Sequence, residues 1–262
     1  MKPYLAILGA RARMLLQYRA AAAAGVACQF FWGLIRMMIF QAFYQNASGP
    51  APMNIEQVVS YVWLAQAFLL LIPFRVDNET AEKIRSGNVV YELLRPIDLY
   101  AHWFARAVAD RIAPVALRAA PMLIVATLAG WLKWTSAAAS IACAAALVAA
   151  TLLSASVCVL VSATMLWTIS GRGIESVILT VTFLLSGIII PLPLFPDSLQ
   201  PVLNWLPFRG LMDVPFRLFS GHIPLGELPG QLARQLAWTV AIGALGKWLL
   251  DRSTRKLVVQ GG

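Results

Sequence analysis

The sequence predicts an all-α integral membrane protein with six membrane-spanning helices. Of its 262 residues, 60% are hydrophobic and only 13% are charged, whereas a soluble domain carries about 25% charged residues. The mean hydropathy is +0.72. The apolar runs are long enough for spanning helices and too long for the short strands of a membrane barrel.

Six apolar runs define the predicted spans, which are residues 20–44, 57–74, 112–131, 137–167, 176–194 and 232–250. The fourth run is rich in Ala and Ser, and small residues let helix backbones approach closely, so we expect it to be buried in the bundle. Between the fifth and sixth runs, residues 195–231 are apolar but rich in proline. Proline interrupts helices, so this segment predicts short, broken helices at the outer membrane face.

Residues 1–19 predict an amphipathic helix that lies in the membrane interface. Apolar side chains such as Tyr4, Leu5 and Leu8 gather on one side of that helix. The basic side chains are Lys2, Arg11, Arg13 and Arg19. We expect them to contact the headgroups of anionic membrane lipids. A plain cytoplasmic extension of the first span is the alternative.

The distribution of basic residues predicts the topology. With the N-terminus inside, most Lys and Arg residues fall in residues 1–19, 75–111 and 168–175 and in the tail, which includes Arg255 and Lys256. The outer loops hold Lys133, Arg209 and Arg217. Cytoplasmic loops are the ones enriched in Lys and Arg, so both termini are predicted to be cytoplasmic.

The longest polar segment, residues 75–111, predicts a docking element. Asp77 or Asn78 caps a helix that begins near Glu79, and the Ser86–Asn88 stretch, with its glycine, ends it. An apolar patch from Val89 to Leu94 follows as a membrane anchor. Mixed charges beside this patch favour a protein interface over a solvated loop. The residues expected to form the docking surface are Glu79, Glu82, Lys83, Arg85, Ser86, Gly87, Asn88, Glu92, Leu94, Arg95 and Pro96.

Motifs for chemistry are missing from the sequence. The Gly246-Lys247 pair is followed by Trp248, where a nucleotide-binding loop requires Ser or Thr. Three unpaired cysteines and two scattered histidines predict neither disulfides nor a metal site. Basic patches interleaved with aromatics are absent, so nucleic acid is not an expected partner. We predict no catalytic residue and no cofactor bound by this chain, and energised work would need another subunit or an ion gradient.

Arg36 lies within the first predicted span and Arg118 within the third, whereas Arg234 and Lys247 lie nearer the ends of the sixth. Ionisable residues inside a membrane are costly and usually functional. Arg36 and Arg118 are candidates for the route of an anionic substrate. The alternatives are contacts with backbone carbonyls and snorkelling to a membrane face. Buried acidic residues, which ion-coupled transport would require, are absent from the predicted spans.

Residues 82–98, EKIRSGNVVYELLRPID, resemble the cytoplasmic loop of type-2 ATP-binding-cassette exporter permeases. The resemblance is to a bacterial subfamily whose loop reads much like IRSGNxxYxLLRPxD, and the span pattern extends it over nearly the whole chain. It implies a permease that pairs with an identical or homologous second permease and sits on two separate ATPase subunits. These subunits would bind ATP and Mg²⁺ and dock on the coupling helix within 75–111. It also implies export across a bacterial cytoplasmic membrane.

Three other readings remain open from the residues alone. The chain could be an ATP-independent carrier or channel. It could be a membrane-embedded enzyme acting on lipids, for which Asp98, His102 and Glu92 are the nearest group of suitable side chains. It could also be a non-transporting assembly or sensory subunit.

Overall fold

The computed structural model describes residues 2–46, 49, 51–73, 76–168 and 172–254. These residues form helices and no strands. Three predicted cytoplasmic cations, Arg75, Arg255 and Lys256, lie outside the described residues, as does part of the predicted turn at 168–175. In chain order the α-helices are α1 (Lys2–Leu15), α2 (Arg19–Asn46), α3 (Ile55–Ala67), α4 (Asn78–Arg85), α5 (Val90–Leu93), α6 (Leu99–Leu128), α7 (Ala137–Thr168), α8 (Arg172–Leu185), α9 (Gln200–Trp205), α10 (Asp213–Phe219) and α11 (Leu228–Thr254).

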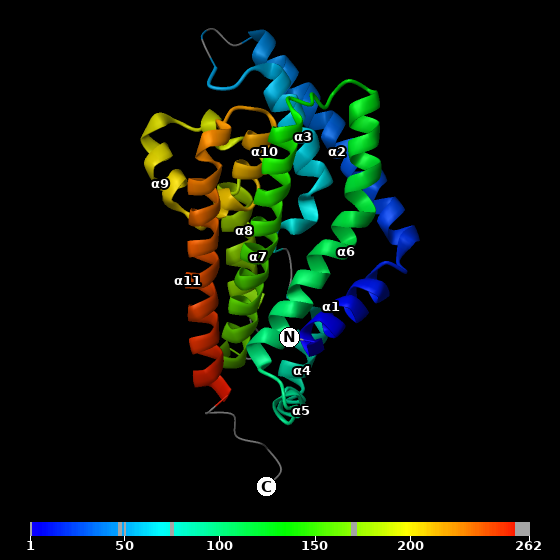
Figure 1. Ribbon diagram of the computed structural model, residues 1–262, viewed down its shortest axis with the longest axis vertical. Coiled ribbons are helices and arrows are strands. Elements are labelled where there is room, and N and C mark those ends of the chain that lie inside the picture. The colour runs from blue at the N-terminus through cyan, green and yellow to red at the C-terminus, as the bar shows by residue number, and fades with distance from the viewer. Residues whose placement is uncertain (1, 47–48, 50, 74–75, 169–171, 255–262) are drawn as a thin grey trace.

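Helix α7 is the central element of the bundle. It packs against α11, α10 and α6, while α2, α3 and α6 pack against one another (Figure 1). Helices α4 and α5 lie at the lower end in this view, near α1 and the end of α11, and α9 and α10 lie toward the other end. Helix α7 carries no charged residue and is mostly buried, which confirms the prediction for the fourth span.

Three helices of the described chain are long and apolar enough to cross a membrane: α2, α6 and α7. Helix α2 matches the predicted first span and α7 the predicted fourth. Helix α11 is 27 residues long, or about 40 Å at 1.5 Å per residue. Helix α11 is less apolar because it carries four charged residues, Arg234, Lys247, Asp251 and Arg252. The total of six spans therefore stays a prediction.

The second span was predicted as one helix over 57–74, and that prediction is wrong. Helix α3 ends at Ala67 and a 3₁₀ turn, η1 (Leu69–Leu71), follows it. Thirteen helical residues extend only about 20 Å, less than the roughly 30 Å hydrocarbon core. Where the backbone leaves the helix, a side chain supplies a hydrogen bond that the helix no longer makes. Ser154 of α7 donates to the Leu71 carbonyl. Irregular backbone at this depth needs such a partner.

The short helix α3 is buried nearly all round and organises the main core. Its Trp63 ring stacks on Trp131 with centroids 4.8 Å apart, and Tyr61 meets Phe216 edge to face at 5.3 Å. A helix that is hydrophobic on every side belongs inside a protein. In this fold α3 is surrounded by α2, α6 and α10.

The fifth span, predicted over 176–194, is also broken. Helix α8 ends at Leu185, and residues 186–190 follow as bends. Gly187 has φ +83°, and a Cβ there would lie 2.4 Å from the Tyr61 hydroxyl oxygen. The chain therefore turns at the one residue type that tolerates both the left-handed backbone and the close approach.

The third predicted span, 112–131, belongs to a longer helix. Helix α6 begins at Leu99, inside the segment predicted as a loop, and Asp98 caps it by accepting a hydrogen bond from Ala101 at 2.8 Å. The charges of Arg106, Asp110 and Arg111 suggested a loop. They are accommodated because α1, α4 and α7 supply their partners.

The proline-rich segment 195–231 forms the short helices that the sequence predicts. Helices α9 and α10 alternate with 3₁₀ turns, and its prolines often stand at the first positions of these elements, where no backbone N–H is needed. Its 3₁₀ turns are η3 (Asp197–Leu199), η4 (Pro207–Gly210) and η5 (Leu225–Glu227), and η2 (Leu192–Leu194) comes directly before it. Gln235 of α11 fastens this region by donating to Gly210 at 2.7 Å and to Ala146 of α7 at 3.1 Å.

Gly187→Ala should destabilise the protein by more than about 2 kcal/mol. The new methyl group meets Tyr61, and the left-handed backbone alone costs about 1–2 kcal/mol for a residue with a side chain. Gly130→Ala is the matched control, because Gly130 has φ +73° in open space. Thermal unfolding of both purified variants in the same detergent measures the difference, and equal losses would contradict the close contact.

Candidate functional site

Helix α4 forms where the sequence predicts it. Asp77 caps its start by accepting from the Glu79 backbone N–H at 3.3 Å, and Ser86 stands at its C-terminus. Gly87 follows with φ +76°, the left-handed conformation that commonly ends a helix. The boundaries are thus the predicted ones, and the four residues of α5 continue the segment. Residues 78–93 are called the α4–α5 segment below.

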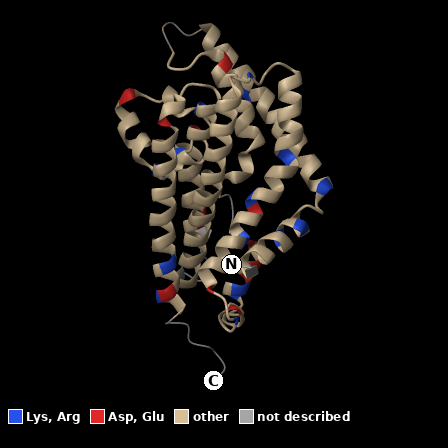
Figure 2. Cartoon of the chain, in the orientation of Figure 1, with Lys and Arg blue, Asp and Glu red and all other residues tan. Residues whose placement is uncertain are grey.

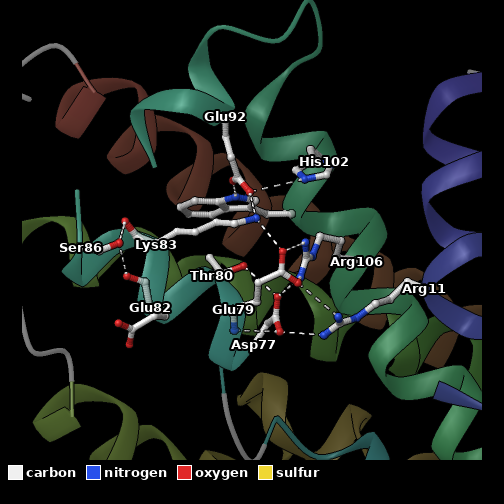
Figure 3. Close-up of polar contacts among 11 residues, drawn as sticks. Arg11, Asp77, Glu79, Thr80, Glu82, Lys83, Ser86, Glu92, His102 and Arg106 are labelled. Atoms are coloured by element: carbon white, nitrogen blue, oxygen red, sulfur yellow. Dashed lines mark hydrogen bonds and ion pairs between the residues drawn. The ribbon is translucent and has the colours of Figure 1, made fainter. Parts of the chain in front are cut away.

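Two arginines from other helices share the carboxylates of α4 (Figure 3). Arg11 of α1 reaches Asp77 at 2.7 Å and Glu79 at 3.4 Å. Arg106 of α6 reaches Glu79 at 2.5 Å and also pairs with Asp77. Arg11 further donates to Asp110 of α6 at 2.8 Å. Helix α4 is therefore joined by charge-assisted hydrogen bonds to both α1 and α6, which are shorter and stronger than neutral ones.

The same network fixes the turn between α4 and α5. Lys83 lies between two carboxylates, at 2.7 Å from Glu79 and 2.8 Å from Glu92. Glu92 is buried and also accepts from the Trp103 indole N–H at 2.8 Å. His102 stands 3.9 Å from the same carboxylate. The α4–α5 segment is held against α6 by these contacts.

The partners set the charge states. Hydrogen bonds from Arg106 and then Lys83 lower the pKa of Glu79 to about 2. Burial lowers the pKa of Lys83, but its hydrogen bonds to Glu79 and Glu92 outweigh burial and raise that pKa above its usual value. Burial likewise opposes ionisation of Glu92, yet Lys83 and Trp103 bring its pKa below the usual range. All three groups are therefore charged at neutral pH.

The structure divides the predicted docking residues into two sets. The exposed ones are Glu82, Arg85, Ser86, Gly87, Asn88, Leu94, Arg95 and Pro96, with Glu79 about half exposed. Lys83 and Glu92 face α6. Glu92 is buried, so it fixes the segment against α6 and does not belong to the exposed docking face. Tyr91 and Leu93 are exposed as well. Of the predicted apolar anchor only Val89 is fully buried, whereas Tyr91, Leu93 and Leu94 are exposed; contact of these side chains with the membrane stays a prediction.

The basic residues of α1 were expected to meet lipid headgroups. For Arg11 the structure corrects this, because three carboxylates surround its guanidinium. Arg13 and Arg19 are exposed, as that expectation requires. The position of α1 against α6 is further fixed by Tyr4, whose hydroxyl accepts from the Asp98 backbone N–H at 3.1 Å.

The two arginines predicted for a substrate route lie in different places. Arg36 lines a cavity of about 970 Å³ between α2 and residues 189–194, and its Nη1 donates to the Ile188 carbonyl at 2.6 Å. Arg118 does not line that cavity; its guanidinium packs against Gly25 of α2. The two residues therefore do not form one site, and a transport role for either stays a prediction.

Several polar residues that position these elements were not singled out from the sequence. Glu175 of α8 accepts from the Val76 backbone N–H at 3.1 Å and so holds the start of the α4 region. Arg111 donates to Ser154 at 2.8 Å. Asp213, fully buried, pairs with Arg217 at 3.0 Å and accepts from Leu192 at 3.3 Å. The i,i+4 spacing of Asp213 and Arg217 was a usable signal; the other contacts join residues far apart in sequence.

Residues proposed for enzymatic chemistry are drawn into structural contacts. His102 approaches Glu92, but Asp98 pairs with Lys247 of α11 at 2.7 Å. Among the described residues no group of three or more His, Cys, Asp or Glu side chains is arranged to hold a metal ion. The polar groups at this end thus hold helices together.

Residues 30–261 match a family model described as an ABC-2 family transporter protein. The chain belongs to the ABC-2 transporter family. This match covers far more than half of the chain. No curated protein matches the chain.

Membership of the ABC-2 family identifies the chain as a permease component of an ABC transporter. The family supplies the transmembrane part and not the ATPase, and it implies association with an ABC ATPase partner. It also agrees with the long apolar helices in making this a multi-pass membrane protein.

Arg106→Met should lower the free energy of unfolding by about 3 kcal/mol, because among the described residues it leaves the largely buried Asp77 with Arg11 as its one cation. Arg85→Met is the matched control, since Arg85 is exposed and its ion pair with the exposed Glu82 is long, at 3.8 Å. That change should stay within about 0.5 kcal/mol. Denaturant titration of both variants in detergent makes the comparison, and similar losses would count against the bracing role of Arg106.

Proposed function

We propose that this ABC-2 permease is an exporter subunit driven by separate ATPase subunits that dock on the exposed face of the α4–α5 segment. The observation that carries the proposal is that the α4–α5 segment has one exposed face, while ion pairs on its other side join it to α1 and α6. Glu82, Arg85 and Asn88 face outward, while Asp77 and Glu79 are fixed by Arg11 and Arg106. A docking element has to be accessible and also joined to what it moves.

The placement of charge supports the same orientation. Figure 2 shows many of the charged residues gathered around α1, α4 and the lower part of α6. The basic residues predicted for the outer side, among them Arg209 and Arg217, lie near the opposite end, with α10. We therefore propose that the α4–α5 segment and both termini lie in the cytoplasm. The proposal of a bacterial cytoplasmic membrane rests on the resemblance of residues 82–98 to the loop of bacterial exporters.

The proposed mechanism transmits motion through fixed contacts. Closure of the two ATPase subunits on ATP, with Mg²⁺ bound there, would displace the α4–α5 segment. Because α4 shares its carboxylates with α1 and α6, both helices would follow as rigid bodies. The route between this permease and a second one, identical or homologous, would then change the side to which it opens. ATP drives the change only through its different affinity for the two states.

Gly87→Val tests the docking assignment. Valine at φ +76° is strained by about 1–2 kcal/mol and reshapes the end of α4 at the centre of the proposed face. We expect loss of permease-stimulated ATP hydrolysis, measured with the reconstituted ATPase, while membrane insertion is retained. Gly130→Val is the matched control, because Gly130 carries the same type of backbone conformation at the other end of α6.

The control separates strain from docking. If the proposal holds, Gly130→Val keeps stimulated ATPase activity although its backbone is strained equally. Normal stimulation in Gly87→Val, or equal loss in both variants, would contradict docking at this face.

A further inference from the structure

Among the described residues, the lining of the cavity beside Arg36 combines one cationic side chain with apolar residues. Helix α2 supplies Trp32, Ile35, Arg36, Ile39, Phe40 and Phe43. Their spacing is i, i+3, i+4, i+7, i+8 and i+11, which is a single helical face. Arg36 therefore stands in the middle of an apolar stripe, and it is the only charged residue among the described ones that line the cavity.

The opposite wall is made by the break in the fifth predicted span. After Gly187 the chain runs without helix through Ile189 and Ile190 to the turn at Leu194, and all three line the cavity. Non-helical backbone at membrane depth is tolerated where protein buries it or where it lines a cavity. The left-handed turn at Gly187, which packs closely against Tyr61, holds this wall in place.

The charge of Arg36 is only partly satisfied by the protein. Its Nη1 donates to the Ile188 carbonyl at 2.6 Å, a neutral acceptor. Among the described residues no carboxylate forms an ion pair with it, whereas Arg11, Arg106, Arg209 and Arg217 all have one. An uncompensated cation in an apolar surrounding favours an anion, because the interaction is strong where the dielectric constant is low.

The rim of the cavity is exposed at the surface of this chain. Trp32, Ile39 and Phe43 at its rim are each more than half exposed. Arg36 lies seventeen positions beyond Arg19, hence about 26 Å along α2. With Arg19 at the inner interface, that depth is in the outer part of the roughly 30 Å hydrocarbon core. A ligand can therefore enter sideways from lipid and keep its polar end near the outer surface.

We propose that this cavity binds an anionic amphiphile, with its carboxylate or phosphate on Arg36 and its apolar chain against Ile39, Phe43 and Ile190. A volume of about 970 Å³ is at the upper end of the usual range of about 300–1,000 Å³ for ligand sites. Binding needs no ATPase; only the further step, that the bound amphiphile is the exported substrate, rests on the proposed function.

The test measures equilibrium binding of radiolabelled dodecanoate and dodecanol to the purified full chain in nanodiscs of uncharged phosphatidylcholine. Dodecanoate should bind saturably and about tenfold more tightly than dodecanol. Arg36→Gln should remove that advantage, a loss of about 1.4 kcal/mol for dodecanoate. Arg36→Lys should retain part of it. Arg118→Gln is the matched control and should bind dodecanoate as the unaltered chain does, because Arg118 is outside the cavity.

A second variant keeps the test independent of the charge change. Ile39→Trp is at an exposed rim position and should weaken both probes by filling the cavity. Adding phosphatidylglycerol to the nanodiscs distinguishes the two sources of such a ligand. Competition with dodecanoate would assign the site to anionic bilayer lipid, and no competition would assign it to single-chain amphiphiles.

Two results would overturn the proposal. One is equal dodecanoate affinity in Arg36→Gln and the unaltered chain, or an equal loss in Arg118→Gln. The other is absence of saturable dodecanoate binding. A disulfide between two copies of Ile39→Cys would then show that a second permease covers this face. Since neither ATPase nor nucleotide is present, failure of the docking proposal leaves this measurement unchanged.

Discussion

The structure depends on ion pairs between the charged groups at one end of an apolar helical bundle. Asp77 and Glu79 are each shared by Arg11 and Arg106, so three helices meet on two carboxylates. Desolvating such ions is expensive, and only good geometry with several hydrogen bonds offsets the cost. Breaking one contact leaves a mostly buried charge such as Asp77 without one of its partners. The end of the bundle is therefore expected to move as a unit.

The same constraint applies to the backbone in the apolar part. Two predicted spans are interrupted, and each interruption is matched by a side-chain partner from elsewhere. Ser154 reaches the Leu71 carbonyl, and Arg36 reaches the Ile188 carbonyl. Because lipid offers no hydrogen bonds, a break in a helix has to be satisfied by protein. One break closes the core under α3, while the other forms a cavity wall. Ser154 therefore supports the backbone beside the core, whereas Arg36 supports the backbone of a cavity wall.

Local features of the fold were predictable from the sequence. The ends of α4 follow from Asp77 and Gly87, and the extent of α7 follows from an uninterrupted apolar run without charges. The breaks after Ala67 and Leu185 were missed, because both stretches are as apolar as a spanning helix. What ends them is a distant partner, Ser154 in one case and the Tyr61 contact of Gly187 in the other. Likewise, Glu92 reads as a surface charge until Lys83 and Trp103 enclose it.

The central claim is that an ATPase docks on the exposed face of the α4–α5 segment. Cysteine cross-linking in native membranes tests it most directly, in a chain whose exposed Cys28 is replaced by Ser. Asn88→Cys places a thiol on the proposed face, and Ser198→Cys places one on an exposed turn near α9, toward the other end of the molecule. The account predicts a cross-link to a soluble ATPase from Asn88→Cys and none from Ser198→Cys. A cross-link from Ser198→Cys, or none from Asn88→Cys while the ATPase co-purifies, would contradict it.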